Sequence, residues 1–289
     1  MKIVPAAILL GLGSVGVGGW YKFSNLKPKT LRQYLEWQGL RLISDSETNY
    51  WKAVIEENGK LISDLSISGV EEVKSWCNRH IDSPNYEDFK DSASLLCVDN
   101  PRTVKARIIQ LYGDTSRLIQ SGNDEDKQYK VAYVFRKHID GFHSLIGYSP
   151  EIGEDGKEVE DLDAAKSAFK EWCTSSLSKA VDETLVLNVK ELCIPKKFSS
   201  IKELIEQRGE STLLLTSGNN SIDLQSKHES IKGLASWKAD NEKNGETQED
   251  LKDWCEKNES KNFSDSKVFS EVYPKFRFRC LKNSEGQPQ

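Results

Sequence analysis

Several features that support catalysis or metal binding are scarce in this chain of 289 residues. It has only four histidines, and its six cysteines include no Cys-x-x-Cys pair, which argues against a zinc site or a thiol-redox centre. No Ser-His-Asp, Cys-His or paired-carboxylate arrangement recurs along the chain. Basic residues are not in excess either, since the net charge is -5, so nucleic acid is not an expected partner. We predict no enzyme activity, no catalytic, cofactor-binding or metal-binding residues, and no small-molecule substrate.

What the sequence does contain is a short string that occurs three times: an apolar residue, Lys, any residue, Trp and Cys. The copies are Val73–Cys77, Phe169–Cys173 and Leu251–Cys255, and each is followed by one further cysteine, at Cys97, Cys193 and Cys280. If each repeat closes on itself, the cysteines form three disulfides, Cys77–Cys97, Cys173–Cys193 and Cys255–Cys280. Closing a loop of about 20 residues stabilises each repeat by roughly 3 kcal/mol.

Helix signals recur in register with these strings and define the repeats. An N-cap residue precedes the first apolar helical stretch of each repeat, at Thr30, Thr103 and Ser200. A glycine that ends the helix follows, at Gly39, Gly113 and Gly209. Thr30 and Ser200 also have the spacing of a capping box, with Gln33 and Glu203 three residues later. We therefore predict repeat 1 over 30–102, repeat 2 over 103–199, repeat 3 over 200–283 and a polar tail over 284–289.

Apolar residues at spacings of three and four predict several short helices in each repeat. Small apolar clusters at 40–43, 118–119 and 213–215 fit either a helix-packing turn or a brief strand. In repeat 3, Pro274 with the alternating Phe276 and Phe278 is expected to break the helical pattern before Cys280. The predicted fold is mainly α, a tandem array of three small helical modules with one cysteine pair each; the alternative is α+β, with short strands in each module. Five tryptophans are expected to form the structural core: Trp51, Trp76, Trp172, Trp237 and Trp254.

Residues 1–23 have the composition of a membrane segment. No charged residue occurs from Ile3 to Trp20, and about 18 residues in a helix span roughly 27 Å, close to a hydrocarbon layer of about 30 Å. We predict an uncleaved signal-anchor over 1–23 that inserts in the lipid bilayer, with a linker over 24–29; a cleaved signal peptide is the alternative. Four basic residues follow the segment and favour a cytoplasmic body by the positive-inside rule: Lys22, Lys27, Lys29 and Arg32. The cysteine pairs favour the opposite topology, because disulfides form in oxidising compartments.

The same segment contains a glycine motif, Gly11–Gly16, that matches the dinucleotide-binding pattern G-x-G-x-x-G. That pattern requires a helix whose N-terminus faces the pyrophosphate. Gly18 and Gly19 follow instead, and each glycine costs a helix about 1 kcal/mol relative to alanine. An NAD(P)-dependent oxidoreductase is therefore only a remote alternative, and we expect no cofactor.

The glycine-rich membrane segment is followed by repeats that open with Thr or Ser and carry Trp-Lys and Trp-Cys strings. In this combination the chain resembles large paralogous families of uncharacterised membrane-anchored proteins of haemotrophic mycoplasmas. The resemblance implies surface display and supplies no catalytic residues. We predict a membrane-anchored, surface-exposed antigen or host-interaction protein without catalysis, with an extracellular body and a host protein as partner. The alternative is a cytoplasm-facing, membrane-tethered scaffold or enzyme with free thiols.

Overall fold

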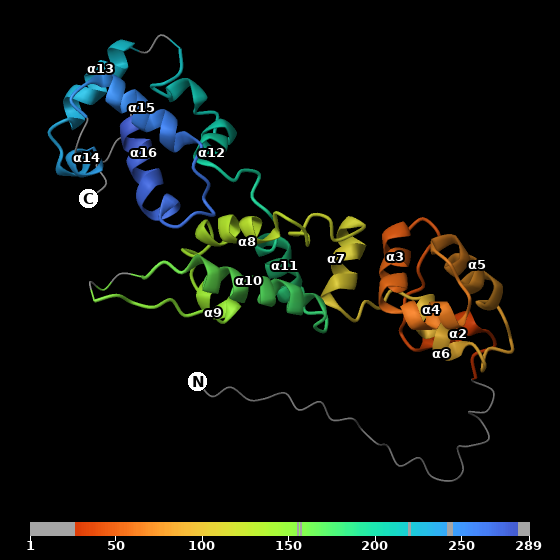
Figure 1. The fold of residues 1–289 in the computed structure, drawn as a ribbon. Helices are drawn as coiled ribbons and strands as arrows, with labels where there is room; N and C mark the ends of the chain where they lie inside the picture. Colours follow the sequence, from red (N-terminus) through yellow and green to blue (C-terminus); the bar gives the residue numbers. More distant parts are fainter. Residues whose placement is uncertain (1–26, 155, 157, 219–220, 242–244, 283–289) are drawn as a thin grey trace, which may run out of the picture. The chain divides into compact units, whose positions relative to one another are not determined.

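The computed structural model describes residues 27–154, 156, 158–218, 221–241 and 245–282 of the chain. The predicted membrane segment, its glycine motif and the tail 284–289 lie outside the described residues. Within those ranges, no helix combines the length and the apolar character needed to cross a bilayer. The described chain is mainly helical (Figure 1). It divides into two compact units.

The first unit contains the residues up to Arg102 together with Ile109–Gly113. Helices of 6 to 11 residues follow one another closely in this unit, so each contributes about two or three turns to a small core. These helices are α2 (Leu31–Trp37), α3 (Thr48–Glu57), α4 (Gly59–Asp64), α5 (Val70–His80) and α6 (Lys90–Leu96).

The second unit contains Thr103–Ile108 and the chain from Asp114 onward, so the helix α7 (Val104–Tyr112) is divided between the two units. Its further helices are α8 (Glu125–Val134), α9 (Phe142–Ile146), α10 (Leu162–Leu177), α11 (Glu183–Leu192), α12 (Ile201–Gln207), α13 (Ser221–Ile231), α14 (Ala235–Asp240), α15 (Gln248–Glu259) and α16 (Tyr273–Cys280). A 3-10 turn, η1 (Ser211–Leu213), and a π-helical turn, η2 (Val268–Val272), complete it. The three-repeat division of the chain remains a prediction, because the structure separates into two units.

The start and stop signals found in the sequence act on the first helix of each repeat. Ser200 and Glu203 form a complete capping box at α12. At α2 only half of the predicted capping box forms. The hydroxyl of Thr30 accepts a hydrogen bond from the backbone N–H of Gln33, but the Gln33 side chain accepts one from the backbone N–H of Lys29 and not from that of Thr30. The glycines at the helix ends have the left-handed φ values +76°, +90° and +69°, at Gly39, Gly113 and Gly209.

One backbone hydrogen bond recurs at the start of the first helix in each repeat. The first residue of α2, α7 and α12 donates its N–H to a carbonyl just beyond the helix that carries the Lys-x-Trp-Cys string. These bonds are Leu31 N to Ser83 O at 3.1 Å, Val104 N to Lys179 O at 3.0 Å and Ile201 N to Lys261 O at 3.1 Å. In each repeat, the start of the first helix is therefore bonded to the chain just beyond the helix that carries the string.

A second recurring backbone bond decides how the small apolar clusters are structured. In each cluster one N–H donates to the carbonyl of the second cysteine of the repeat: Ile43 to Cys97 at 3.1 Å, Ile119 to Cys193 at 2.8 Å and Leu215 to Cys280 at 2.9 Å. The β-type pairing in the described ranges is limited to isolated bridges, such as those between Leu42 and Val98 and between Leu214 and Leu281, and no strand forms there. The predicted mainly-α fold is confirmed, and the α+β alternative is not supported.

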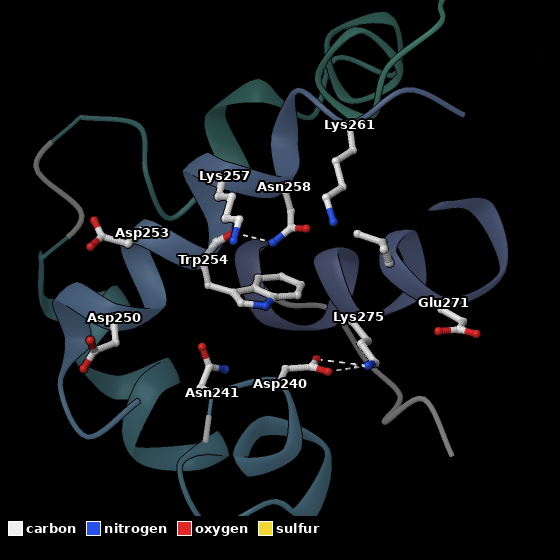
Figure 2. Close-up of a pocket in the computed structure, with 11 residues that line it drawn as sticks. Asp240, Asn241, Asp250, Asp253, Trp254, Lys257, Asn258, Lys261, Glu271 and Lys275 are labelled. Carbon is white, nitrogen blue, oxygen red and sulfur yellow. Dashed lines mark hydrogen bonds and ion pairs between the residues drawn. The ribbon is translucent and has the colours of Figure 1, made fainter. Parts of the chain in front are cut away.

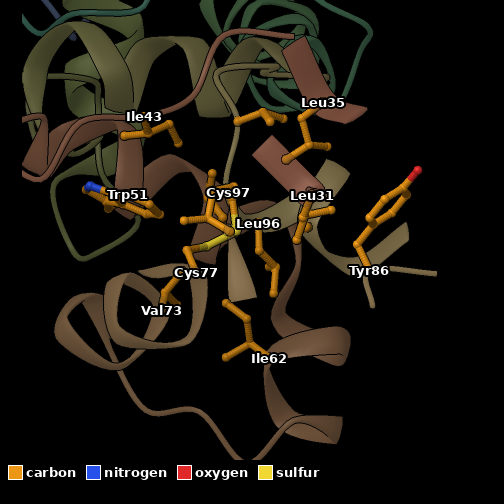
Figure 3. Packing of buried hydrophobic residues seen from close by; sticks show 14 residues of the cluster. Leu31, Leu35, Ile43, Trp51, Ile62, Val73, Cys77, Tyr86, Leu96 and Cys97 are labelled. Carbon is orange, nitrogen blue, oxygen red and sulfur yellow. A yellow bond between two sulfur atoms is a disulfide. The ribbon is translucent and has the colours of Figure 1, made fainter. Parts of the chain in front are cut away.

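The core of the first unit surrounds a disulfide between Cys77 at the end of α5 and Cys97 just after α6 (Figure 3). Leu31 and Leu35 from α2 and Trp51 from α3 pack in this cluster, and none of the three is more than 2% exposed. A core of this size excludes little apolar surface from water, so a covalent link inside it makes a large relative contribution to stability.

The expectation that Pro274 breaks the helical pattern is wrong. Pro274 occupies the first turn of α16, which continues to Cys280, and the π-helical turn η2 precedes it. Proline is tolerated there because the N–H groups of a first turn have no acceptor inside the helix. Phe276 is 1% exposed, so the helix places it in the core.

Side chains from repeats 2 and 3 contact each other within the second unit. The ring of Phe135 in repeat 2 meets two rings of repeat 3 edge-on, those of Phe263 and Phe269, at centroid distances of 4.9 and 4.8 Å. Glu160, from the acidic stretch 151–163, accepts hydrogen bonds from the hydroxyls of Ser266 and Ser270 and from the N–H of Lys267. Both contacts explain why these repeats share one unit.

Candidate functional site

The six cysteines predicted to pair form three disulfides in the structure, Cys77–Cys97, Cys173–Cys193 and Cys255–Cys280. All six are at least 96% buried, because their exposed fractions range from 0% to 4%. Buried sulfur atoms are not accessible to a substrate. The cysteines therefore stabilise the fold and do not form a reactive surface.

The five tryptophans predicted as core residues differ in burial. Trp51 and Trp237 are 2% and 1% exposed, and their indole N–H groups donate to the carbonyls of Ser44 and Gly245, both at 2.9 Å. Trp172 is also buried, at 8% exposed. Trp76 and Trp254 are only half-buried. These two belong to the recurring string, and Trp254 lines a cavity.

A buried arginine lies beside Trp254, and no sequence signal pointed to it. Arg279 of α16 is 1% exposed, and its guanidinium carbon lies 5.2 Å from the ring centroid of Trp237 and 4.6 Å from that of Trp254. Its Nη1 is 2.7 Å from Oδ2 of Asp240, while its buried Nη2 has no hydrogen-bond partner among the described residues. Burial lowers the pKa of Arg279, and the bond to Asp240 opposes this effect.

Asp240, at the end of α14, is the carboxylate that compensates this buried charge. It also pairs with Lys275, whose Nζ is 2.9 Å from Oδ1. Burial alone raises the pKa of Asp240, but the hydrogen bonds from Lys275 and Arg279 outweigh burial and hold the pKa below its usual value. The carboxylate therefore stays ionised and links α14 to α16.

A cavity of about 390 Å³ opens beside the Trp254 indole (Figure 2). Parts of α14, α15, η2 and α16 form its walls. Figure 2 shows Lys257, Asn258 and Lys261 on one side of the indole and Asp240 and Asn241 on the other. The remaining lining residues are Asp250, Asp253, Glu271, Val272 and Lys275. We call this cavity the Trp254 pocket.

The charges of the Trp254 pocket are unevenly compensated. Glu271 pairs with Lys267 at 3.3 Å, and Asp250 accepts a hydrogen bond from Thr247 in the capping box of α15. Neither Asp250 nor Asp253 forms an ion pair with a described residue. Lys257 and Lys261 likewise form no ion pair with any described residue. The pocket therefore presents two ammonium groups that lack a carboxylate partner in the described chain.

Comparisons of the whole chain with protein-family models, with curated proteins and with solved structures find no match. Metal chemistry has no candidate in the described ranges either, because no three His, Cys, Asp or Glu side chains are grouped to hold an ion there. The Trp254 pocket brings an indole, two lysines and several hydrogen-bond acceptors together, and is a candidate binding site in the described chain.

Proposed function

We propose that the chain is a membrane-anchored protein with an extracytoplasmic body that binds a partner without catalysing a reaction. The observation that carries this proposal is that all six cysteines are paired and buried in three disulfides. Disulfides of this kind persist in oxidising compartments and are rare in a reducing cytoplasm. The uncharged stretch from Ile3 to Trp20 supports the membrane anchor, and the resemblance to surface-displayed mycoplasma proteins supports an extracytoplasmic body.

In this proposal the bilayer holds the N-terminal segment and a host protein, or a saccharide that it carries, is the partner of the body. The disulfides and the recurring backbone bonds hold the fold together. The surface that binds the partner is then expected among features found in one repeat only, because residues that recur in every repeat are explained by the fold they share. The Trp254 pocket is one such feature, since it depends on Arg279 and Asp240, which repeats 1 and 2 do not reproduce.

A thiol count tests the compartment and the pairing together. The full chain is extracted from cells in the presence of an alkylating reagent and weighed as an intact protein, with and without prior reduction. Three disulfides predict six alkyl labels after reduction and none before it. Six labels without reduction contradict the proposal and favour a cytoplasmic protein.

Protease treatment of intact cells tests the topology separately. The body is expected to be removed at the surface, while a cytoplasmic marker protein survives until the cells are permeabilised. Complete protection in intact cells, followed by digestion after permeabilisation, would contradict an extracellular body.

A cytoplasm-facing scaffold or enzyme is the second candidate, and the basic residues beyond the predicted anchor favour it. They are Lys22, Lys27, Lys29 and Arg32. The thiol count and the protease experiment have opposite outcomes for the two candidates. The remote oxidoreductase alternative predicts NAD(P) binding that is lost when Gly11 and Gly13 are substituted.

A further inference from the structure

We propose that the Trp254 pocket binds an anionic saccharide, that is, a hydroxylated ring that carries a carboxylate or a sulfate group. This inference deepens the proposed binding function by naming a ligand class. It uses residues of repeat 3 only, and binding by the purified chain does not depend on its membrane topology. The two proposals can therefore fail independently.

The two uncompensated lysines account for the anionic group. Lys257 lies in the last turn of α15 and Lys261 two residues after its end, and Figure 2 shows both on the same side of the Trp254 indole. Of the four carboxylates that line the pocket, those of Asp240 and Glu271 are paired with Lys275 and Lys267. Figure 2 shows the other two, Asp250 and Asp253, at the end of the pocket away from Lys261. An anion between the two ammonium groups forms charge-assisted hydrogen bonds, which are about twice as strong as neutral ones.

Trp254 accounts for the ring. The indoles of Trp51 and Trp237 donate their N–H groups to backbone carbonyls, whereas the half-buried Trp254 makes no such bond with a described residue. The Arg279 guanidinium, 4.6 Å from the Trp254 centroid, covers the indole and holds it in place. The pocket therefore offers a fixed aromatic surface, beside the apolar side chain of Val272, with an indole N–H that donates to no described residue.

The opposite side of the pocket accounts for the hydroxyl groups. The side-chain N–H of Asn241 donates to the carbonyl of Trp237 at 3.0 Å, and its amide oxygen, which accepts from no described residue, can serve as an acceptor for a ligand. The carboxylate of Asp240 lies on the same side (Figure 2). An inorganic anion would use the lysines but neither these acceptors nor the indole, and a neutral sugar would leave the lysines unused. The volume of about 390 Å³ suits one or two sugar rings.

Calorimetric titration of the purified full chain, with its disulfides intact, tests this inference. Three ligands with one common ring are compared: a methyl glucuronoside, a sulfated methyl glucoside and the neutral methyl glucoside. We expect binding of one or both charged ligands and at least tenfold weaker binding of the neutral one. Binding of only the glucuronoside assigns the anion as a carboxylate, and binding of only the sulfated sugar assigns it as a sulfate.

Variants connect the binding to the pocket. Replacing both Lys257→Gln and Lys261→Gln is expected to weaken binding at least tenfold without changing the melting temperature. The matched control replaces two lysines outside the pocket, Lys238→Gln and Lys252→Gln, and should bind normally.

Trp254→Phe retains an aromatic ring but removes the indole N–H, and is expected to weaken binding of the charged sugar. Three results overturn the inference: equal affinity for the neutral glucoside, full competition by equimolar acetate or inorganic sulfate, or no binding of any sugar up to about 10 mM.

Discussion

Removing the Asp240 carboxylate should destabilise the second unit strongly, because it leaves a buried guanidinium without a counter-charge. Arg279 is 1% exposed and its Nη1 lies 2.7 Å from Asp240 Oδ2. Breaking a buried pair by deleting one partner costs about 3 to 5 kcal/mol, since the remaining charge stays out of water. In a unit of this size, such a loss lowers the melting temperature by about 6 to 20 °C.

The assay is urea unfolding of the full chain under non-reducing conditions, followed by circular dichroism and by hydrogen exchange in α16. Asp240→Ala should lose about 3 to 5 kcal/mol, and Asp240→Asn should lose less because it keeps an acceptor for Arg279. Adding Arg279→Met to Asp240→Ala should recover most of the loss, because apolar residues often replace a buried ion pair without cost. The matched control is Asp253→Ala, at an exposed residue of the same pocket, with an expected effect within about 0.5 kcal/mol.

The pH dependence provides an independent check on the same pair. The pKa of Asp240 is lowered in the folded chain, so its contribution is fully present above the unfolded value of about 3.9 and is lost as the pH falls through the folded pKa. The stability difference between the wild type and Asp240→Ala should therefore shrink in acid. The reasoning is refuted if Asp240→Ala costs less than about 1 kcal/mol at neutral pH, or if the difference between the two proteins does not decrease in acid.

Three further outcomes are expected. Replacing Cys173 and Cys193 together by Ala should cost about 3 kcal/mol in chemical unfolding, because the loop they close is then open in the unfolded chain; an unchanged unfolding free energy under non-reducing conditions would contradict this. Glu160→Ala should cost about 1 to 3 kcal/mol and speed hydrogen exchange in residues 266–272, because Ser266, Lys267 and Ser270 donate to its carboxylate; unchanged exchange rates there would argue against the contact. Gly209→Ala should cost about 1 kcal/mol, since φ is +69° but nothing lies within 4 Å of an added Cβ. Gly245→Ala should cost more in the same unfolding measurement, because its added Cβ would lie 2.9 Å from the Trp237 indole nitrogen; equal costs at the two glycines would be inconsistent with that clash.

The cysteine pairing and the mainly-α class were predictable because they depend on patterns local in the sequence. A cysteine that follows each copy of the string at nearly constant spacing can pair within its own repeat, and the structure contains these pairs with separations of 20, 20 and 25 residues. Caps such as Ser200 and stops such as Gly209 act within one helical turn, so their neighbours in the sequence are also their partners. Pro274 was misjudged, because its effect depends on whether it lies in the first turn or the interior of a helix.

The Trp254 pocket was not predictable, because its parts come from segments that the fold alone brings together. Asp240 and Arg279 are 39 residues apart in the sequence, and neither residue type by itself indicates burial. Trp51 and Trp254 are the same residue type, yet one is a buried core residue and the other lines a cavity. That difference depends on what the neighbouring helices leave uncovered.

By itself, the sequence determined the helical class, the start and end of the first helix in each repeat and the partner of each cysteine. These properties follow from short-range hydrogen bonding, helical periodicity and loop closure. Only the tertiary structure decided that the small apolar clusters pair with the chain around the second cysteines. Tertiary packing also buried Arg279 against two tryptophans and left Lys257 and Lys261 without carboxylate partners in the described chain. The physical reason is that burial and charge compensation depend on which distant side chains come within a few ångströms of each other.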